Sequence, residues 1–180
     1  NGKPLEEDKQ TGTKGTEAGS SEETADKEEA EAEEADSDEA EAEAEEAVEE
    51  IEAAIEVEND LRSEIVTYAL QFVGNRYKYG GTNPNTGVDC SGFTSYVMRH
   101  AASVELPHSS GGQSRLGRVV SSSEMRPGDI ICYGSGKRIN HVALYIGNGQ
   151  IVHASTERTG IKVSRWNYRT PVRIVNVLGD

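Results

Sequence analysis

The sequence predicts an α+β domain at residues 60–180, preceded by an acidic arm. Helical patterns come first in this region and strand patterns with short connections follow, which is typical of α+β folds. Charge separates the same two pieces. Residues 1–60 carry 4 Lys and 25 Asp+Glu, net −21, whereas residues 61–180 carry 14 Lys+Arg and 7 Asp+Glu, net +7. The total charge of −14 therefore hides two oppositely charged parts.

The N-terminal part is of low complexity. Residues 1–46 are mainly Glu, Ala, Ser, Thr, Gly and Asp, with almost no large apolar side chain. Such a segment cannot bury enough apolar surface to offset the entropy of ordering, so we expect a disordered arm at residues 1–46. Residues 47–59 place Val48, Ile51 and Ile55 on one helical face and predict a marginal helical linker.

The first helix of the domain is expected to begin near Asp60. Asn59 and Asp60 are suited to cap this helix, and Gly74 is placed to end it. Its apolar stripe consists of Leu61, Ile65, Ala69, Phe72 and Val73. We therefore expect one face of this helix to pack on the rest of the domain.

A second helix is predicted from about Ser91 to Ala102, because apolar residues recur there at three- and four-residue steps. Asp89 is the natural N-cap of this helix. Cys90 then lies near unpaired N–H groups and the positive end of the helix dipole, which favours the thiolate. Cys90 is therefore a candidate nucleophile, and the alternative is a small buried side chain, since free cysteine is among the most buried residue types.

The C-terminal half predicts antiparallel strands. Pro127-Gly128-Asp129 turns into a strand at residues 130–133, which contains Cys132 in an apolar run and predicts a core position for it. Residues 141–146 and 150–154 form a predicted hairpin, and residues 166–177 offer one or two further strands.

The register of the predicted hairpin decides whether its two histidines meet. With a two-residue turn at Asn148-Gly149, His141 and His153 would point to opposite faces. With a three-residue loop, Gly149 in the left-handed conformation and a bulge, Ala143 would face His153 and both histidines would share one face. Only the bulged register allows the two histidines to act together, whereas any single histidine could simply be a structural residue.

Several kinds of protein are disfavoured by the composition. Two cysteines give no disulfide framework, and the cysteines and histidines lack the spacing of a metal site. There is no apolar run long enough to cross a membrane and no nucleic-acid-binding motif. We therefore expect no metal, no cofactor, no nucleic-acid partner and no membrane span.

The stretches YKYGG, DCSGFTSYV, RPGDIICY and HVALYIGNGQIVHAS resemble the NlpC-type cell-wall peptidases, the family of NlpC and the sixty-kilodalton invasion-associated protein. The resemblance covers about residues 61–178. It implies a papain-like fold, with N-terminal helices packed on a central antiparallel sheet. It also implies that Cys90 is the nucleophile, His141 the base and acid, and His153 the residue that orients His141.

The resemblance further implies a substrate pocket and a substrate. Tyr77, Asp89 and Ser91 match family positions beside the nucleophile, whereas Tyr79 departs from the tryptophan of many members. The implied activity is a peptidoglycan endopeptidase that cuts the bond from D-γ-glutamate to the diamino acid of wall stem peptides. A related amidase or acyl hydrolase, or a wall-binding module without turnover, is the alternative.

The resemblance also has implications for the location of the protein and for its acidic arm. It implies a bacterial protein that is secreted or associated with the cell wall, and we expect the domain to act as a monomer. The acidic arm is either a solvated spacer or a segment that folds back on the basic domain, whose surface would otherwise approach anionic wall polymers.

Overall fold

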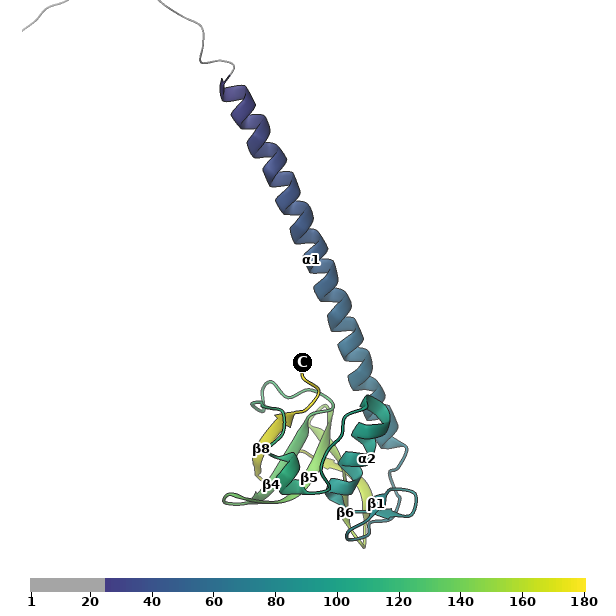
Figure 1. Ribbon diagram of the computed structural model, residues 1–180. Helices are drawn as coiled ribbons and strands as arrows, with labels where there is room; N and C mark the ends of the chain where they lie inside the picture. The colour runs from purple at the N-terminus through teal and green to yellow at the C-terminus, as the bar shows by residue number, and fades with distance from the viewer. Residues whose placement is uncertain (1–24) are drawn as a thin grey trace, which may run out of the picture. The chain divides into compact units, whose positions relative to one another are not determined.

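The computed structural model describes the backbone of residues 25–180 and side chains from residue 46 on. The chain divides into two units, residues 1–50 and residues 51–180. The disorder expected for residues 1–24 lies outside the described residues. The α+β fold expected for the C-terminal unit is confirmed (Figure 1).

The first helix is longer than the sequence patterns predicted. Helix α1 spans Ala25–Leu70 without a break, so no new helix begins at Asn59 and Asp60, where a start was expected. No glycine or proline occurs in this range, and alanine and glutamate have high helix propensity. Gly74 has the positive φ of 94° expected of a residue that ends a helix, in the turn that follows Leu70.

A six-stranded antiparallel sheet forms the centre of the domain, in the order β3-β8-β4-β5-β6-β7. Its strands are β3 (Arg118–Val119), β4 (Ile130–Ser135), β5 (Arg138–Gly147), β6 (Gln150–Thr156), β7 (Gly160–Arg165) and β8 (Pro171–Asn176). The strands predicted at 130–133, 141–146 and 150–154 are confirmed as parts of β4, β5 and β6. In the 166–177 region only β8 forms, and β7, which ends before Trp166, was not predicted.

The remaining elements are short, apart from one helix. Strands β1 (Thr82–Asn83) and β2 (Gly87–Val88) pair with each other and lead into α2 (Cys90–Ala102). Helix α3 (Ser110–Gln113) follows α2. Asp89 is the N-cap of α2, as predicted.

Two apolar cores lie on the two faces of the sheet. The larger core joins the last turns of α1 and the buried face of α2 to one face of the sheet, and it contains Phe93, Cys132 and Val142. The smaller core contains Ile131, Tyr133 and Ile151, with Trp166 against it. Side chains alternate in β4, so neighbouring residues enter different cores. Cys132 is completely buried, which confirms the prediction that it belongs to the core.

The β5–β6 hairpin has the register that allows both histidines to share a face. Leu144 lies opposite Val152 and Tyr145 opposite Ile151, and one further step places Ala143 opposite His153. The turn that produces this register differs from the predicted three-residue loop. Asn148 and Gly149, with φ of 52° and 71°, form a two-residue turn, and the bulge lies between Tyr145 and Gly147. The bulged residue restores the same register that a three-residue loop would have given.

A buried arginine ties α1 to the sheet. Arg62 is 3% exposed, and its guanidinium pairs with Asp129 at 3.1 Å and with Asp180 at 2.5 Å. Arg126 joins the network through Asp180 and Glu58. Burial raises the pKa of Asp180, but hydrogen bonds from Arg62 and other neighbours outweigh it and hold this pKa well below its ordinary value.

The ion pairs of Arg62 should contribute to the free energy of unfolding. Arg62→Met should lower the free energy of unfolding at neutral pH by about 3–5 kcal/mol, because it leaves Asp129 buried without its cation. The Asp180 pKa is lower in the folded state, so its contribution is present at neutral pH and is lost as the pH falls below about 4. Urea unfolding at several pH values should therefore show the variant and the native protein converging in acid. A constant difference down to the lowest pH would contradict this account.

Arg99→Met is the matched control for this experiment. Arg99 pairs with Glu105 on the surface, where solvent screens the interaction. We expect this control to unfold like the native protein.

Candidate functional site

A short loop brings the chain to the start of α2. Val88 donates its N–H to the carbonyl of Arg76, and Lys78 donates to the carbonyl of Val88. Asp89 then donates its N–H to the carbonyl of Gly81. These backbone bonds hold residues 76–81 beside residues 87–89, so that the YKYGG stretch lies against the helix start.

The Asp89 carboxylate holds three segments together at this point. Its Oδ1 accepts the N–H of Gly92 at 2.8 Å, which caps α2, and its Oδ2 accepts the N–H of Gly80 at 3.0 Å. His108 Nε2 lies 2.8 Å from Oδ1. From the sequence, His108 was predicted in a loop without a role, because no local pattern links it to a residue 19 positions away.

Gly92 permits the close approach of the helix to the loop. A Cβ atom at this position would collide with the carbonyl oxygen of Gly81 and come within 2.9 Å of the Asp89 carboxylate. The glycine of the DCSGF stretch is therefore explained by packing. Its absence of a side chain lets the first turn of α2 dock on the loop at Gly81.

Cys90 is the first residue of α2 and is partly buried. Burial raises the pKa of its thiol, and the Asp89 charge adds to this effect. Backbone hydrogen bonds from Val142 and from the first turn of the helix act in the opposite direction but do not outweigh burial. The net shift is upward, whereas the helix start alone was expected to favour the thiolate. Desolvation is the stronger effect here.

His141 and His153 form a buried pair on the sheet. His141 Nε2 lies 2.8 Å from His153 Nδ1, and His153 Nε2 lies 2.9 Å from the Ser164 hydroxyl on β7. The histidines are 8% and 1% exposed. Burial lowers the pKa of His141 to about 4, with a contribution from Arg169. Burial and the neighbouring His141 and Lys162 lower the pKa of His153 to about 3. Both rings are therefore neutral at pH 7.

Two proton arrangements satisfy this chain of three residues. In the first, His141 Nε2–H donates to His153 and His153 Nε2–H donates to Ser164, which leaves Nδ1 of His141 as an acceptor. In the second, each proton is reversed and Ser164 is the donor. Ser164 was not predicted from the sequence, because its contact with His153 depends on the pairing of β6 with β7.

The other predicted residues lie in the same cluster. Burial raises the pKa of Tyr77, and electrostatic interactions with Cys90 and Asp89 add to this shift, which places Tyr77 near both residues. Ser91 is buried, and its hydroxyl lies 3.5 Å from Asp89 Oδ1, at the limit of a hydrogen bond. Cys90 is linked to the histidine strand through the backbone of Val142, the residue after His141. The structure thus brings all six predicted site residues into one region.

Two further residues of this region, Tyr168 and Arg169, lie between β7 and β8. The Tyr168 ring is 5.3 Å from the His153 ring and 5.2 Å from the Tyr133 ring, between centroids. Burial raises the pKa of Tyr168, and Cys90 contributes to the shift, so this side chain lies near the thiol as well. Strands were predicted here, and neither residue was predicted to belong to the site.

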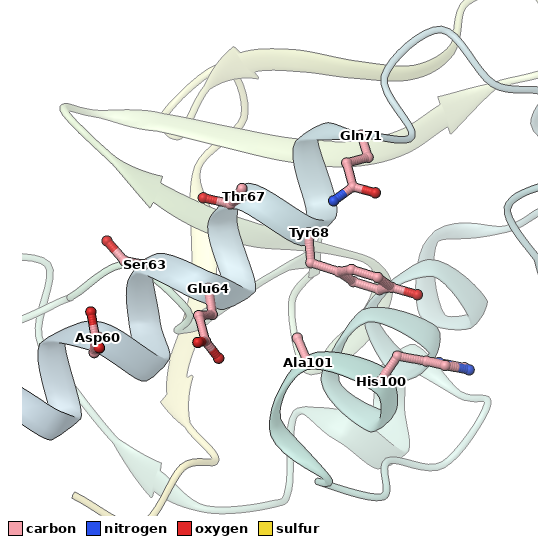
Figure 2. A pocket seen from close by; sticks show the side chains of 8 residues that line it. All are labelled: Asp60, Ser63, Glu64, Thr67, Tyr68, Gln71, His100 and Ala101. Carbon is pink, nitrogen blue, oxygen red and sulfur yellow. The ribbon is translucent and has the colours of Figure 1, made fainter.

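One groove of the domain lies apart from this cluster. The groove in Figure 2 has a volume of about 410 Å³ and lies between the last turns of α1 and the end of α2. His100 stacks there on Tyr96 with a centroid separation of 4.0 Å. None of the six predicted site residues lines this groove. Within the described residues, no cluster of three metal-ligating side chains occurs, and no helix is long and apolar enough to cross a membrane.

An α+β domain with a cysteine at a helix start and a histidine pair on an antiparallel sheet has the architecture of papain-like domains. The chain belongs to the NlpC/P60 family, whose model matches residues 74–174. Over 108 residues it is 40% identical to murein DD-endopeptidase MepS/murein LD-carboxypeptidase of Escherichia coli K12, covering 60% of this chain and 56% of the relative. The chain thus spans about half the length of this curated relative.

Two other proteins extend the comparison. Probable endopeptidase p60 of Listeria seeligeri is 42% identical over 98 residues, covering 54% of this chain and 18% of the relative. The crystal structure of the NlpC/p60 domain of the peptidoglycan hydrolase SagA superposes with a TM-score of 0.59 at 32% identity, covering 64% of this chain and 97% of that domain. The similarity extends over the unit that carries the cluster.

Proposed function

We propose that this protein is a peptidoglycan hydrolase that uses Cys90 as a thiol nucleophile. The observation that carries the proposal is the buried hydrogen bond of 2.8 Å between His141 and His153, on the strand whose backbone contacts Cys90. The names of the relatives agree in kind, because MepS and p60 are described as endopeptidases and SagA as a peptidoglycan hydrolase.

The proposed chemistry uses the first proton arrangement of the histidine chain. Nδ1 of His141 takes the proton of the Cys90 thiol while Sγ attacks the peptide carbonyl. The resulting imidazolium gives this proton to the amine that leaves, and an acyl-thiol intermediate remains. Water then attacks the acyl carbon with His141 as base, and the thiol is restored as the carboxylate product departs.

His153 and Ser164 are proposed to orient His141. His153 accepts the Nε2–H of His141, which keeps the basic lone pair of His141 on Nδ1. Ser164 accepts the remaining N–H of His153 at 2.9 Å. A neutral thiol beside a neutral imidazole is the resting state, because burial disfavours both charged forms. Substrate binding and proton transfer then create the charges only when they are needed.

The finer proposal concerns the bond that is cut. The NlpC-type resemblance supports cleavage between D-γ-glutamate and the diamino acid of the stem peptide. The name of the Escherichia coli relative, a DD-endopeptidase, supports a second candidate for the bond that is cut, the cross-linking peptide bond between two D-configured amino acid centres. Both bonds lie in wall peptides, so the proposed protein acts outside the cytoplasmic membrane, as a secreted or wall-associated enzyme.

Tyr77, Asp89 and Ser91 are proposed to bind the N-terminal side of the substrate. Asp89 Oδ1 is occupied by Gly92 and His108, whereas only the Gly80 N–H bonds to Oδ2 among the described residues. Oδ2 therefore keeps capacity for another donor. In a γ-glutamyl substrate, the free α-amine of L-alanine is a cation that this oxygen would pair with.

The thiol mechanism predicts that Cys90→Ala abolishes hydrolysis of wall peptides, with a rate loss of about 10³-fold or more. Cys132→Ala is the matched control, because Cys132 is buried in the core and burial raises its pKa to about 12. The control should keep most of its activity. Iodoacetamide should label Cys90 first, as peptide mapping by mass spectrometry would reveal. Activity that survives in Cys90→Ala would remove the thiol from the mechanism.

The substrate pocket predicts a need for a free amine. N-acetylation of L-Ala-D-γ-Glu-diaminopimelate should slow cleavage strongly, because the Asp89 carboxylate then faces no cation in a partly dry pocket. The measurement is kcat/KM for the free and the acetylated peptide, side by side. Equal values would mean that Asp89 serves only as the helix cap and loop anchor.

A further inference from the structure

The β7–β8 loop places a cation beside the histidine pair. Arg169 Nη2 donates to Asn140 Oδ1 at 2.9 Å, and Asn140 directly precedes His141. The guanidinium carbon lies 5.7 Å from the centre of the Tyr133 ring, and Tyr133 faces His141 across β4 and β5. Arg169 is therefore held at the entrance to His141 by a strand residue and an aromatic ring.

This cation has no counter-charge within the part of the chain that the structure describes. The charged pairs found in residues 46–180 involve Arg62, Arg99, Arg126 and His108, and no carboxylate there lies within 4.0 Å of Arg169. Most other basic residues of the domain are spread over its surface. Arg169 is partly buried, and its charge lowers the pKa of His141, which requires electrostatic proximity. Lys162 is partly buried as well, but its charge acts on His153.

The guanidinium also has unused donors. Arginine carries five N–H donors in a planar fork that matches a carboxylate, and Arg169 directs them to Asn140 and Tyr168, which leaves donors free. The hydroxyl-bearing ring of the neighbouring Tyr168 is 44% exposed and adds a second polar group at the same rim. A fixed, partly desolvated arginine without an anion, next to a candidate catalytic base, is suited to bind the anion of a substrate.

We propose that Arg169, with Tyr168 beside it, is the subsite for a substrate carboxylate adjacent to the scissile bond. This inference rests on the proposed function, because it identifies the part of the wall peptide that the same site recognises. A γ-linked glutamyl residue keeps its α-carboxylate free within a few bonds of the reacting carbonyl. The diamino acid on the leaving side carries a carboxylate at a similar distance. Both sources offer the same ligand chemistry.

The test compares acid and amide forms of one peptide. The substrates are L-Ala-D-γ-Glu-diaminopimelate, the same peptide with the glutamyl α-carboxylate amidated, and the peptide with the carboxylate next to the diaminopimelate amine amidated. The proteins are the native chain, Arg169→Gln and Arg169→Lys. Arg165→Gln is the matched control, because Arg165 follows Ser164 in β7 and its side chain points to the opposite face of the sheet.

We expect Arg169→Gln to lose about 10- to 100-fold in kcat/KM on the acid peptide, mostly through KM. The native protein should lose a similar factor in kcat/KM when one of the two carboxylates is amidated. The peptide that shows this loss identifies the carboxylate that Arg169 binds. Arg169→Gln should show no further loss on that amide. Arg169→Lys should recover part of the activity, and Arg165→Gln should behave as native. Equal amidation losses in native protein and Arg169→Gln would overturn the proposal.

The pH profile separates this role from a purely electrostatic one. Removing the Arg169 charge lets His141 bind a proton at higher pH. The acid limb of the pH profile of kcat/KM should therefore move to higher pH in Arg169→Gln. If the acid limb shifts in Arg169→Gln but the ratio of kcat/KM for the acid and amide peptides stays as in the native protein, Arg169 only lowers the pKa of His141 and binds no carboxylate. Failure of the native protein to cleave any wall peptide would instead reject the proposed function. Native-like cleavage that ignores amidation would reject the subsite alone.

Discussion

The Asp89 carboxylate is the interaction on which the site depends. It caps α2 through Gly92, holds the YKYGG loop through Gly80 and contacts His108 from the segment after α2. The loop can approach this closely only because residue 92 is glycine. One side chain thus fixes the first turn of α2, and the first turn fixes Cys90 against the backbone of β5. The position of the thiol follows from an ordinary helix cap with two additional partners.

Burial sets the electrostatics of the site more than the helix dipole does. It raises the pKa of Cys90 and lowers the pKa values of His141 and His153, so each group favours its neutral form. The histidine chain ends on Ser164, a neutral hydroxyl that can accept or donate, rather than on a carboxylate. A carboxylate would stabilise the imidazolium at rest. The observed arrangement orients His141 without charging it, and Arg169 disfavours its protonation further.

Local sequence patterns predicted the features that depend on neighbouring residues. The cap at Asp89 and the core position of Cys132 follow from capping and periodicity, and the structure agrees. The sequence left two hairpin registers open, and the structure has the one in which His141 and His153 share a face. Features that depend on distant pairing were missed, namely the contact of His108 with Asp89, the role of Ser164 on β7 and the site position of Arg169. A new helix was expected to begin at Asn59 and Asp60, whereas α1 continues through both residues, because no glycine or proline interrupts it and alanine and glutamate favour the helix.

The central claim is that Cys90 and the histidine pair hydrolyse wall stem peptides after D-γ-glutamate. Mass spectrometry tests it most directly, after digestion of stem peptides that have been released from the glycan and so carry a free L-Ala amine, with native protein and Cys90→Ala in parallel. The account predicts the dipeptide L-Ala-D-Glu, together with peptides that begin with a diamino acid bearing a free α-amine, and neither product with Cys90→Ala. Fragments that all retain an intact bond between D-glutamate and the diamino acid would contradict it.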